Sequence, residues 1–92
     1  NRLKIQKHVQ IIDVRTKEEF ENFSLPKLKA LNIPLNELKD RTEELDSLNP
    51  IYLLCQSGKR SGMAVSILEG INPELELYNI LGGVDQFLAL QK

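Results

Sequence analysis

The residues most able to carry chemistry lie in one seven-residue segment that begins at the only cysteine of the chain. The segment reads C-Q-S-G-K-R-S over residues 55–61. Gly58 allows a tight turn that points backbone N–H groups inward, and the positive end of a following helix would add to them. Lys59 and Arg60 bring two full charges to the same place. The segment therefore predicts an anion cradle that lowers the pKa of Cys55 and makes its thiolate available as a nucleophile.

The ordinary alternative is a buried cysteine at the end of a strand, because free cysteine is among the most buried residue types. Two cations at a helix start oppose the helix dipole, however, and their presence there favours a functional site. His8, the single histidine, is expected at the surface, and its pairing with Cys55 as a catalytic dyad stays open. One Cys and one His are too few for a zinc site, so we expect no metal and no cofactor.

Short apolar stretches predict the strands that position this segment. They span residues 9–14, 51–55 and 75–80, and residues 31–33 add a short fourth strand that Pro34 would end. Residues 51–55 are almost wholly apolar, as in a parallel strand that is covered on both faces. Cys55 ends this strand, and open parallel sheets bind their ligands at the carboxyl ends of strands.

Helical patterns alternate with the strands. Thr16 is expected to cap a helix whose first turn holds Glu18 and Glu19, which suit the positive end of the helix dipole. Residues 34–48 predict a second helix, because Pro34 fits its start and leucines recur at helical spacing.

Two further helices are expected in the second half of the chain. Residues 61–70 predict a helix that Gly70 would end, with one apolar side made of Met63, Ala64, Ile67 and Leu68. A terminal helix is expected after Gly82-Gly83, a pair that suits a turn with positive φ, and its apolar residues are Val84, Phe87, Leu88 and Leu90. Alternating strands and helices predict an α/β fold with a mainly parallel sheet.

Length and composition set limits on the protein. The 92 residues suffice for one small domain, which we expect over residues 1–92, and the start at Asn1 suggests a piece of a longer protein. The net charge of −1 gives no reason to expect binding to nucleic acid or to an anionic membrane. No apolar run approaches the roughly 20 residues that span a bilayer, and we expect no signal peptide. A single cysteine excludes an internal disulfide, and we expect a cytoplasmic protein.

Four segments in order resemble motifs of the rhodanese-like (sulfurtransferase) family. Residues 55–61 are similar to its active-site loop, C-x-x-G-x-R-S. Residues 13–20 resemble D-V-R-x-x-x-E-[FY], and residues 32–34 match N-I-P. Residues 81–87 resemble L-x-G-G-x-x-x-W in its G-G-x-x-x-W part, with Phe87 in place of tryptophan. The resemblance covers residues 11–87 and implies a three-layer fold with helices on both faces of the sheet.

The sequence departs from the family in one place and points to a subfamily in another. Residues 23–30 lack the G-H-I-P-G-A that usually precedes N-I-P, which puts the local packing in doubt and leaves the cradle untouched. Residues 33–38 read I-P-L-N-E-L and resemble rhodanese domains fused behind adenylylating enzymes of molybdopterin and thiamine biosynthesis.

The resemblance implies a sulfurtransferase or sulfur carrier that forms a persulfide on Cys55. Thiosulfate or a cysteine desulfurase would supply the sulfur, and a small ubiquitin-like sulfur carrier would accept it beside a linked N-terminal adenylyltransferase domain. Asp13 and Arg15 would be mainly structural. The substrate-binding residues would be Gln56, Ser57, Gly58, Lys59, Arg60 and Ser61.

Two other functions stay open from the sequence. Cysteine phosphatases share this fold but need a wider loop, C-x5-R, whereas Cys55 and Arg60 are separated by four residues. A non-catalytic module that only binds a partner is the other alternative, although such domains often lose the cysteine that is kept here.

Overall fold

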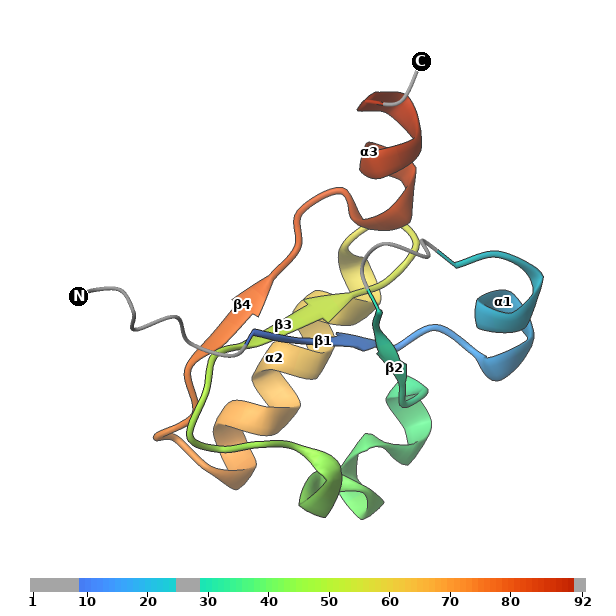
Figure 1. The fold of residues 1–92 in the computed structure, drawn as a ribbon. Coiled ribbons are helices and arrows are strands. Elements are labelled where there is room, and N and C mark those ends of the chain that lie inside the picture. Colours follow the sequence, from blue (N-terminus) through green and yellow to red (C-terminus); the bar gives the residue numbers. More distant parts are fainter. Residues whose placement is uncertain (1–8, 25–28, 91–92) are drawn as a thin grey trace.

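A computed structural model describes residues 9–24 and 29–90, except for the side chains of Phe87, Ala89 and Leu90. Its four strands form one parallel sheet in the order β2-β1-β3-β4 (Figure 1). The four predicted strands are confirmed, each somewhat shorter than expected, as Gln10–Asp13 (β1), Leu31–Asn32 (β2), Ile51–Leu54 (β3) and Leu77–Asn79 (β4). His8 and residues 25–28 lie outside the described residues, so the predictions made for them are not addressed.

The strand order places the connecting segments on the two faces of the sheet. The step from β1 to β2 runs in one direction across the sheet, and the steps to β3 and β4 run in the other. Right-handed crossovers therefore put the first connection on one face and the later ones on the opposite face. The connections hold Lys17–Asn22 (α1), then Leu35–Asp40 (η2) and Thr42–Glu44 (η3), then Lys59–Ile71 (α2), with Gly83–Leu90 (α3) after β4. The predicted α/β fold is confirmed.

The start of α1 is as the sequence predicts. The Thr16 hydroxyl accepts a hydrogen bond from the backbone N–H of Glu19, whose carboxylate accepts one from the N–H of Thr16. This reciprocal capping box fixes the first turn and places Glu19 at the positive end of the helix. No helix in the described part of the chain is long and apolar enough to cross a membrane.

The predicted helix over residues 34–48 is wrong in type and length. The segment forms the two short 3-10 helices η2 and η3, and Leu48 beyond them is 89% exposed. Arg41 stands between them with φ −124°, and its guanidinium binds the carboxylates of Glu37 and Glu44. The spacing of three residues between Leu35 and Leu38 suits a 3-10 turn, which puts side chains i and i+3 on one side.

Helix α2 covers one face of the sheet, and its buried apolar residues pack in the hydrophobic core. Its buried residues are Ser61, Ala64 and Leu68, at helical spacing, whereas Met63 is 51% exposed. The expectation that Met63 belongs to the packed side is wrong, because it lies about 100° around the helix from Ala64. Gly70 does not end the helix, which continues to Ile71 and is capped at Asn72. The core is completed by residues that lie in η2, in the strands or directly after them, namely Ile12, Val14, Ile33, Leu38, Ile51, Leu53 and Cys55.

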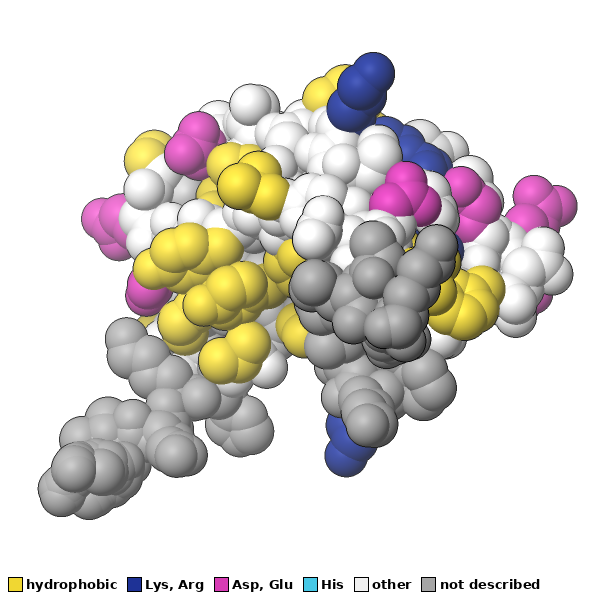
Figure 2. Space-filling view, turned by 90° about the horizontal axis from the view of Figure 1, so that it is seen from above, with side chains coloured by type: hydrophobic (Ala, Val, Ile, Leu, Met, Phe, Trp, Pro, Cys, Tyr) yellow, Lys and Arg dark blue, Asp and Glu magenta, His cyan; other side chains and the backbone are white. Residues whose placement is uncertain are grey.

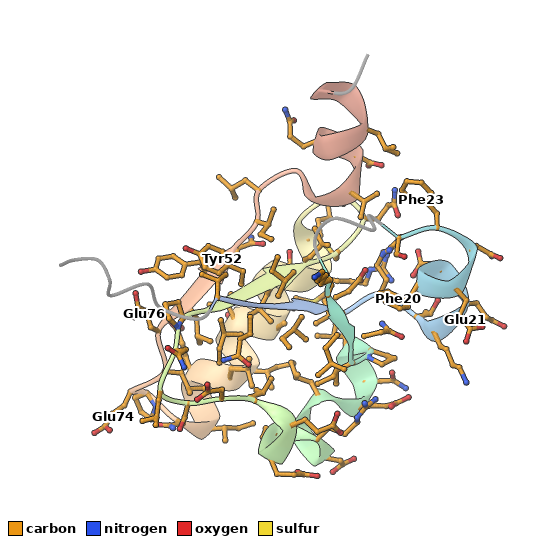
Figure 3. The ribbon with its side chains drawn as sticks, viewed as in Figure 1. Phe20, Glu21, Phe23, Tyr52, Glu74 and Glu76 are labelled. Carbon is orange, nitrogen blue, oxygen red and sulfur yellow. The ribbon has the colours of Figure 1, made fainter. Side chains whose placement is uncertain are left out.

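The opposite face of the sheet is covered less completely. Tyr52 points away from α2 (Figure 3), and Tyr78 pairs with it in register, with ring centroids 4.9 Å apart. Tyr78 is 42% exposed. Figure 2 shows hydrophobic side chains that remain at the surface of the molecule in this view from above. At the carboxyl end of β3 this face is covered, since Leu54 is 2% exposed.

Candidate active site

The loop that contains Cys55 turns sharply between the end of β3 and the start of α2. Cys55 follows the last residue of β3, and Gly58 with φ 106° is the N-cap of α2. A Cβ atom at Gly58 would lie 3.1 Å from the backbone nitrogen of Gly82. Only glycine combines this positive φ with so close a backbone neighbour without strain. The tight turn that the sequence predicts at Gly58 is therefore present.

The loop surrounds the sulfur of Cys55 with donors. The backbone N–H of Gly58 donates to Cys55 Sγ at 3.0 Å, and Ser61 Oγ lies 3.4 Å from it. Burial of this residue, which is 1% exposed, opposes ionisation and by itself would raise the pKa of the thiol. Hydrogen bonds from the Ser61 hydroxyl and from the N–H groups of Ser61, Gly58 and Ser57 outweigh it and bring the pKa of Cys55 below its ordinary value. The geometry therefore favours the thiolate.

The N-terminus of α3 holds the loop from behind. The N–H of Val84 donates to the carbonyl of Cys55 and that of Asp85 to the carbonyl of Gln56, both at 2.9 Å. These are N–H groups that a helix start leaves without an internal partner. Gly83 has φ 57°, and the predicted positive φ at Gly82-Gly83 is confirmed. With both carbonyls fixed against α3, the N–H groups that follow are free to face the sulfur.

A buried polar network ties the end of β1 to the loop. The Arg15 guanidinium donates to both carboxylate oxygens of Asp13, and the two side chains are 2% and 1% exposed. Arg15 Nη1 also donates to Gln56 Oε1 at 3.2 Å, and Gln56 Nε2 donates to Asp85 Oδ1 at 2.7 Å. Arg15 thus links the first strand to the active-site region, as expected for a mainly structural residue. The Gln56 amide is occupied on both sides by protein groups.

The two cations of the loop have different surroundings. Arg60 Nη1 and Nη2 donate to the two carboxylate oxygens of Glu19, at 2.7 and 3.1 Å. The hydrogen bond from Arg60 is the main cause that lowers the pKa of Glu19 to about 2, with the N–H of Thr16 adding to it. The side chain of Lys59 is exposed and makes no hydrogen bond or ion pair with the described residues. The structure thus brings Arg60 to the rim of the cradle and leaves Lys59 in solvent.

Asn79 near the end of β4 is a site residue that the motifs do not reveal. Its side chain contacts the hydroxyl of Ser61 and the carbonyl of Gly58. Glu19 is the second such residue, since the sequence marks it only as a helix-start acid. A usable signal existed for Asn79, because it is a polar residue near the carboxyl end of a predicted strand, where sites in parallel sheets lie.

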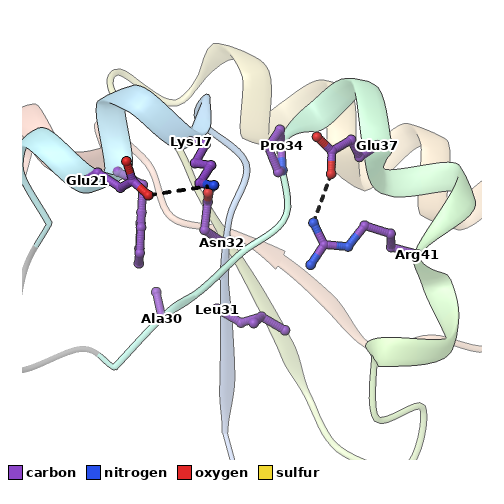
Figure 4. A pocket seen from close by; sticks show the side chains of 9 residues that line it. Lys17, Glu21, Ala30, Leu31, Asn32, Pro34, Glu37 and Arg41 are labelled. Carbon is purple, nitrogen blue, oxygen red and sulfur yellow. Dashed lines mark hydrogen bonds and ion pairs between the residues drawn. The ribbon is translucent and has the colours of Figure 1, made fainter.

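A pocket lies elsewhere in the molecule, at the outer edge of β2. It has a volume of about 610 Å³, and its charged residues are paired as Lys17 with Glu21 and Arg41 with Glu37 (Figure 4). None of its lining residues belongs to the loop 55–61. Among the described residues, no group of three His, Cys, Asp or Glu side chains is placed to hold a metal ion.

Comparisons with known proteins agree with this geometry. The family model for the rhodanese-like domain matches residues 1–90. Bacillus subtilis YqhL is 46% identical over 74 residues, which cover 80% of this chain and 56% of YqhL. The adenylyltransferase and sulfurtransferase uba4 of Ogataea parapolymorpha is 35% identical over 86 residues, covering 92% of this chain and 21% of uba4.

A solved structure has the same fold. The rhodanese-like domain protein from Staphylococcus aureus superposes with a TM-score of 0.76 and 32% identity, covering 87% of this chain and 74% of that one. The chain spans only a little over half of YqhL and about a fifth of uba4. The fold, the loop that holds Cys55 and the match over residues 1–90 lead to one conclusion: the chain belongs to the rhodanese-like domain family.

Proposed function

We propose that this chain is a sulfurtransferase or sulfur carrier that holds sulfur as a persulfide on Cys55. The observation that carries the proposal is the cradle itself, in which the N–H of Gly58 donates to Sγ at 3.0 Å at the N-terminus of α2. Such a site stabilises a thiolate, and it would equally stabilise the anion of a persulfide. The relative uba4, which is named an adenylyltransferase and sulfurtransferase, supports the same assignment.

The loading step is a nucleophilic displacement at sulfur. The Cys55 thiolate attacks the outer sulfur of thiosulfate, a new S–S bond forms, and the old S–S bond breaks. Its electron pair leaves with sulfite, so the cysteine becomes Cys55–S–S⁻. An acceptor nucleophile then takes the outer sulfur and returns the electron pair to Sγ, which completes a two-step covalent cycle.

The loop residues would take different parts in this cycle. We assign anion binding to the backbone N–H groups of Ser57, Gly58 and Ser61, which hydrogen-bond the sulfur. The hydroxyl of Ser61 would assist the thiolate form. Arg60 would add its positive charge at the rim. Gln56 would act by position alone, because its amide is held by Arg15 and Asp85. Lys59, which is exposed, would attract anionic donors towards the loop.

Phosphatase chemistry fits this site poorly. A phosphatase arginine must face the phosphate from within the loop, whereas both terminal nitrogens of Arg60 donate to Glu19. The segment between Cys55 and Arg60 is one residue shorter than the C-x5-R loop of cysteine phosphatases, so it suits one sulfur atom better than a tetrahedral phosphate. A purely passive module is also disfavoured, because the surroundings of Cys55 lower its pKa.

The identity of donor and acceptor is a finer part of the proposal. Thiosulfate or the persulfide of a cysteine desulfurase would load Cys55. The relative uba4 is named an adenylyltransferase as well as a sulfurtransferase. We therefore propose as acceptor the adenylated C-terminus of a small ubiquitin-like sulfur carrier. With this acceptor the outer sulfur of the persulfide would itself be the nucleophile: it would form a C–S bond to the carbonyl carbon, and AMP would leave with the electron pair of the broken C–O bond. An external thiol would then attack Cys55 Sγ of the acyl disulfide and release the thiocarboxylate. The mixed disulfide left on Cys55 would be reduced by a further thiol, which frees the cysteine. A linked adenylyltransferase domain would supply the activated acceptor.

Intact-mass spectrometry after incubation with thiosulfate tests the central claim. The chain should gain one sulfur atom, dithiothreitol should remove it, and Cys55→Ser should gain none. Release of one sulfite per loaded chain gives an independent count. A cysteine desulfurase with cysteine serves as the second donor. The proposal is wrong if Cys55 alkylates readily and neither donor adds sulfur to it.

A further inference from the structure

The hydroxyl of Ser61 lies among three partners that cannot all receive its hydrogen. Ser61 Oγ is 2.5 Å from Asn79 Oδ1, 3.1 Å from the carbonyl oxygen of Gly58 and 3.4 Å from Cys55 Sγ. A serine hydroxyl carries a single hydrogen. The partner that holds it determines whether the sulfur receives a donor from Ser61.

The orientation of the Asn79 amide follows from its second contact. Asn79 Nδ2 lies 3.3 Å from the carbonyl oxygen of Gly58. A carbonyl oxygen only accepts, so the NH2 group of the amide must face it and Oδ1 must face Ser61. Asn79 Oδ1 is therefore an acceptor fixed in place, and at 2.5 Å it is the nearest of the three partners of Ser61.

From this geometry we infer that Asn79 is a positioning residue that draws the Ser61 hydrogen away from the sulfur of Cys55. In the neutral site the thiol donates to Ser61 Oγ, and Ser61 donates to Asn79 Oδ1. When Cys55 ionises, the Ser61 hydroxyl has two choices. It can donate to the thiolate, and Asn79 then loses its hydrogen bond from Ser61, or it can keep donating to Asn79, and the thiolate then lacks that hydrogen bond. Ionisation thus costs one hydrogen bond that the neutral thiol keeps.

The same contact has a consequence for sulfur transfer, which rests on the proposed function. In the persulfide the negative charge moves to the outer sulfur, and Sγ becomes a neutral atom bonded to carbon and sulfur. The Ser61 hydrogen can then return to Asn79 without competition. Asn79 therefore stabilises the thiol and the persulfide but not the thiolate between them, and this keeps the thiolate reactive towards a sulfur donor.

The charged groups around Cys55 come from four other parts of the fold. They are Lys59 and Arg60 on α2, Glu19 on α1, Asp13 and Arg15 at the end of β1, and Asp85 on α3. The change Asn79→Leu leaves every one of these charges in place. A shift in the titration of Cys55 in this variant would therefore report the hydrogen bond.

The experiment measures the rate of alkylation of Cys55 by iodoacetamide across pH in the full chain. Asn79→Leu leaves the carbonyl of Gly58, at 3.1 Å, as the competing acceptor for the Ser61 hydrogen. The variant should therefore lower the titration midpoint by up to about one pH unit, the value of one hydrogen bond between neutral groups. Alkylation below the midpoint should then be up to about tenfold faster. Ser61→Ala should raise the midpoint. Because Asn79 acts through Ser61, adding Asn79→Leu to Ser61→Ala should cause no further shift.

The controls separate this role from a general loosening of the loop. Asn36→Leu makes the same chemical change at an exposed position of η2 and should leave the midpoint unchanged. Asn79→Ala gives the same test if the leucine variant does not fold, as judged by circular dichroism. An unchanged or raised midpoint in both Asn79 variants would overturn the inference, and so would an equal shift in the Ser61→Ala background. Alkylation needs no sulfur transfer, so its result is independent of the proposed function.

Discussion

Gly83 is the position where one added methyl group should disturb the loop around Cys55 most directly. A Cβ atom at Gly83 would lie 2.2 Å from the carbonyl oxygen of Cys55 and 2.7 Å from the carbonyl carbon and oxygen of Gln56. All three atoms belong to the backbone, so no side chain can move aside. In Gly83→Ala the start of α3 must therefore move away from the loop.

The cost of this change can be worked out from the contacts. The two hydrogen bonds from Val84 and Asp85 to the loop carbonyls would be lost or stretched, at about 1 kcal/mol each. Alanine at φ 57° adds about 1 to 2 kcal/mol. We expect Gly83→Ala to lower the free energy of unfolding by about 3 kcal/mol or more, which is a large part of the stability of a small domain.

Gly70→Ala is the matched control for this prediction. Gly70 lies within α2, and no atom lies within 4 Å of an added Cβ. The same substitution there should stabilise the chain by up to about 1 kcal/mol, because alanine favours the helix. Urea unfolding followed by circular dichroism measures both variants, since the chain has no tryptophan. If the free energy of unfolding of Gly83→Ala lies within about 0.5 kcal/mol of that of the unchanged chain, α3 does not pack on the loop as described.

Three further predictions concern charge and access. Arg15→Met should cost about 3 to 5 kcal/mol of unfolding free energy because it leaves the Asp13 carboxylate buried without its cation, and Asp13→Leu added to it should recover part of the loss in urea unfolding. Glu19→Gln should cost about 1 kcal/mol near neutral pH, a value kept small by solvent at this partly exposed pair. Pairing lowers the pKa of Glu19 from 4.5 to about 2, so the difference should be full above pH 4.5 and disappear as the pH falls to about 2 in unfolding curves taken across that range. An equal difference at both ends would contradict this. Because Cys55 is 1% exposed, its alkylation rate should fall more steeply with the size of the reagent than the rate of a free thiol such as glutathione. A competition assay between the two thiols measures this difference. If both rates depend equally on reagent size, the sulfur of Cys55 is open to solvent.

Much of the fold and the centre of the site could be predicted from local sequence patterns. The apolar run before Cys55 predicts a buried strand, and the strand order of a parallel α/β fold puts its end at the ligand-binding edge. Gly58 marks the tight turn, and Thr16 with Glu19 marks a helix start. The prediction was wrong over residues 34–48, because leucine spacing alone cannot distinguish a 3-10 turn from an α-helix. Arg41 leaves the helical backbone conformation there and separates η2 from η3.

By itself, the sequence determined which residue is the candidate nucleophile and which strand it follows, because those features depend on neighbours along the chain. The tertiary structure decided which groups surround Cys55. Glu19 reaches Arg60 across 41 positions, and Asn79 reaches Ser61 across 18. The N-terminus of α3 meets the carbonyls of Cys55 and Gln56 from nearly 30 positions away. These contacts form only when the parallel strands bring their carboxyl ends to one edge, so no spacing within a short segment could reveal them.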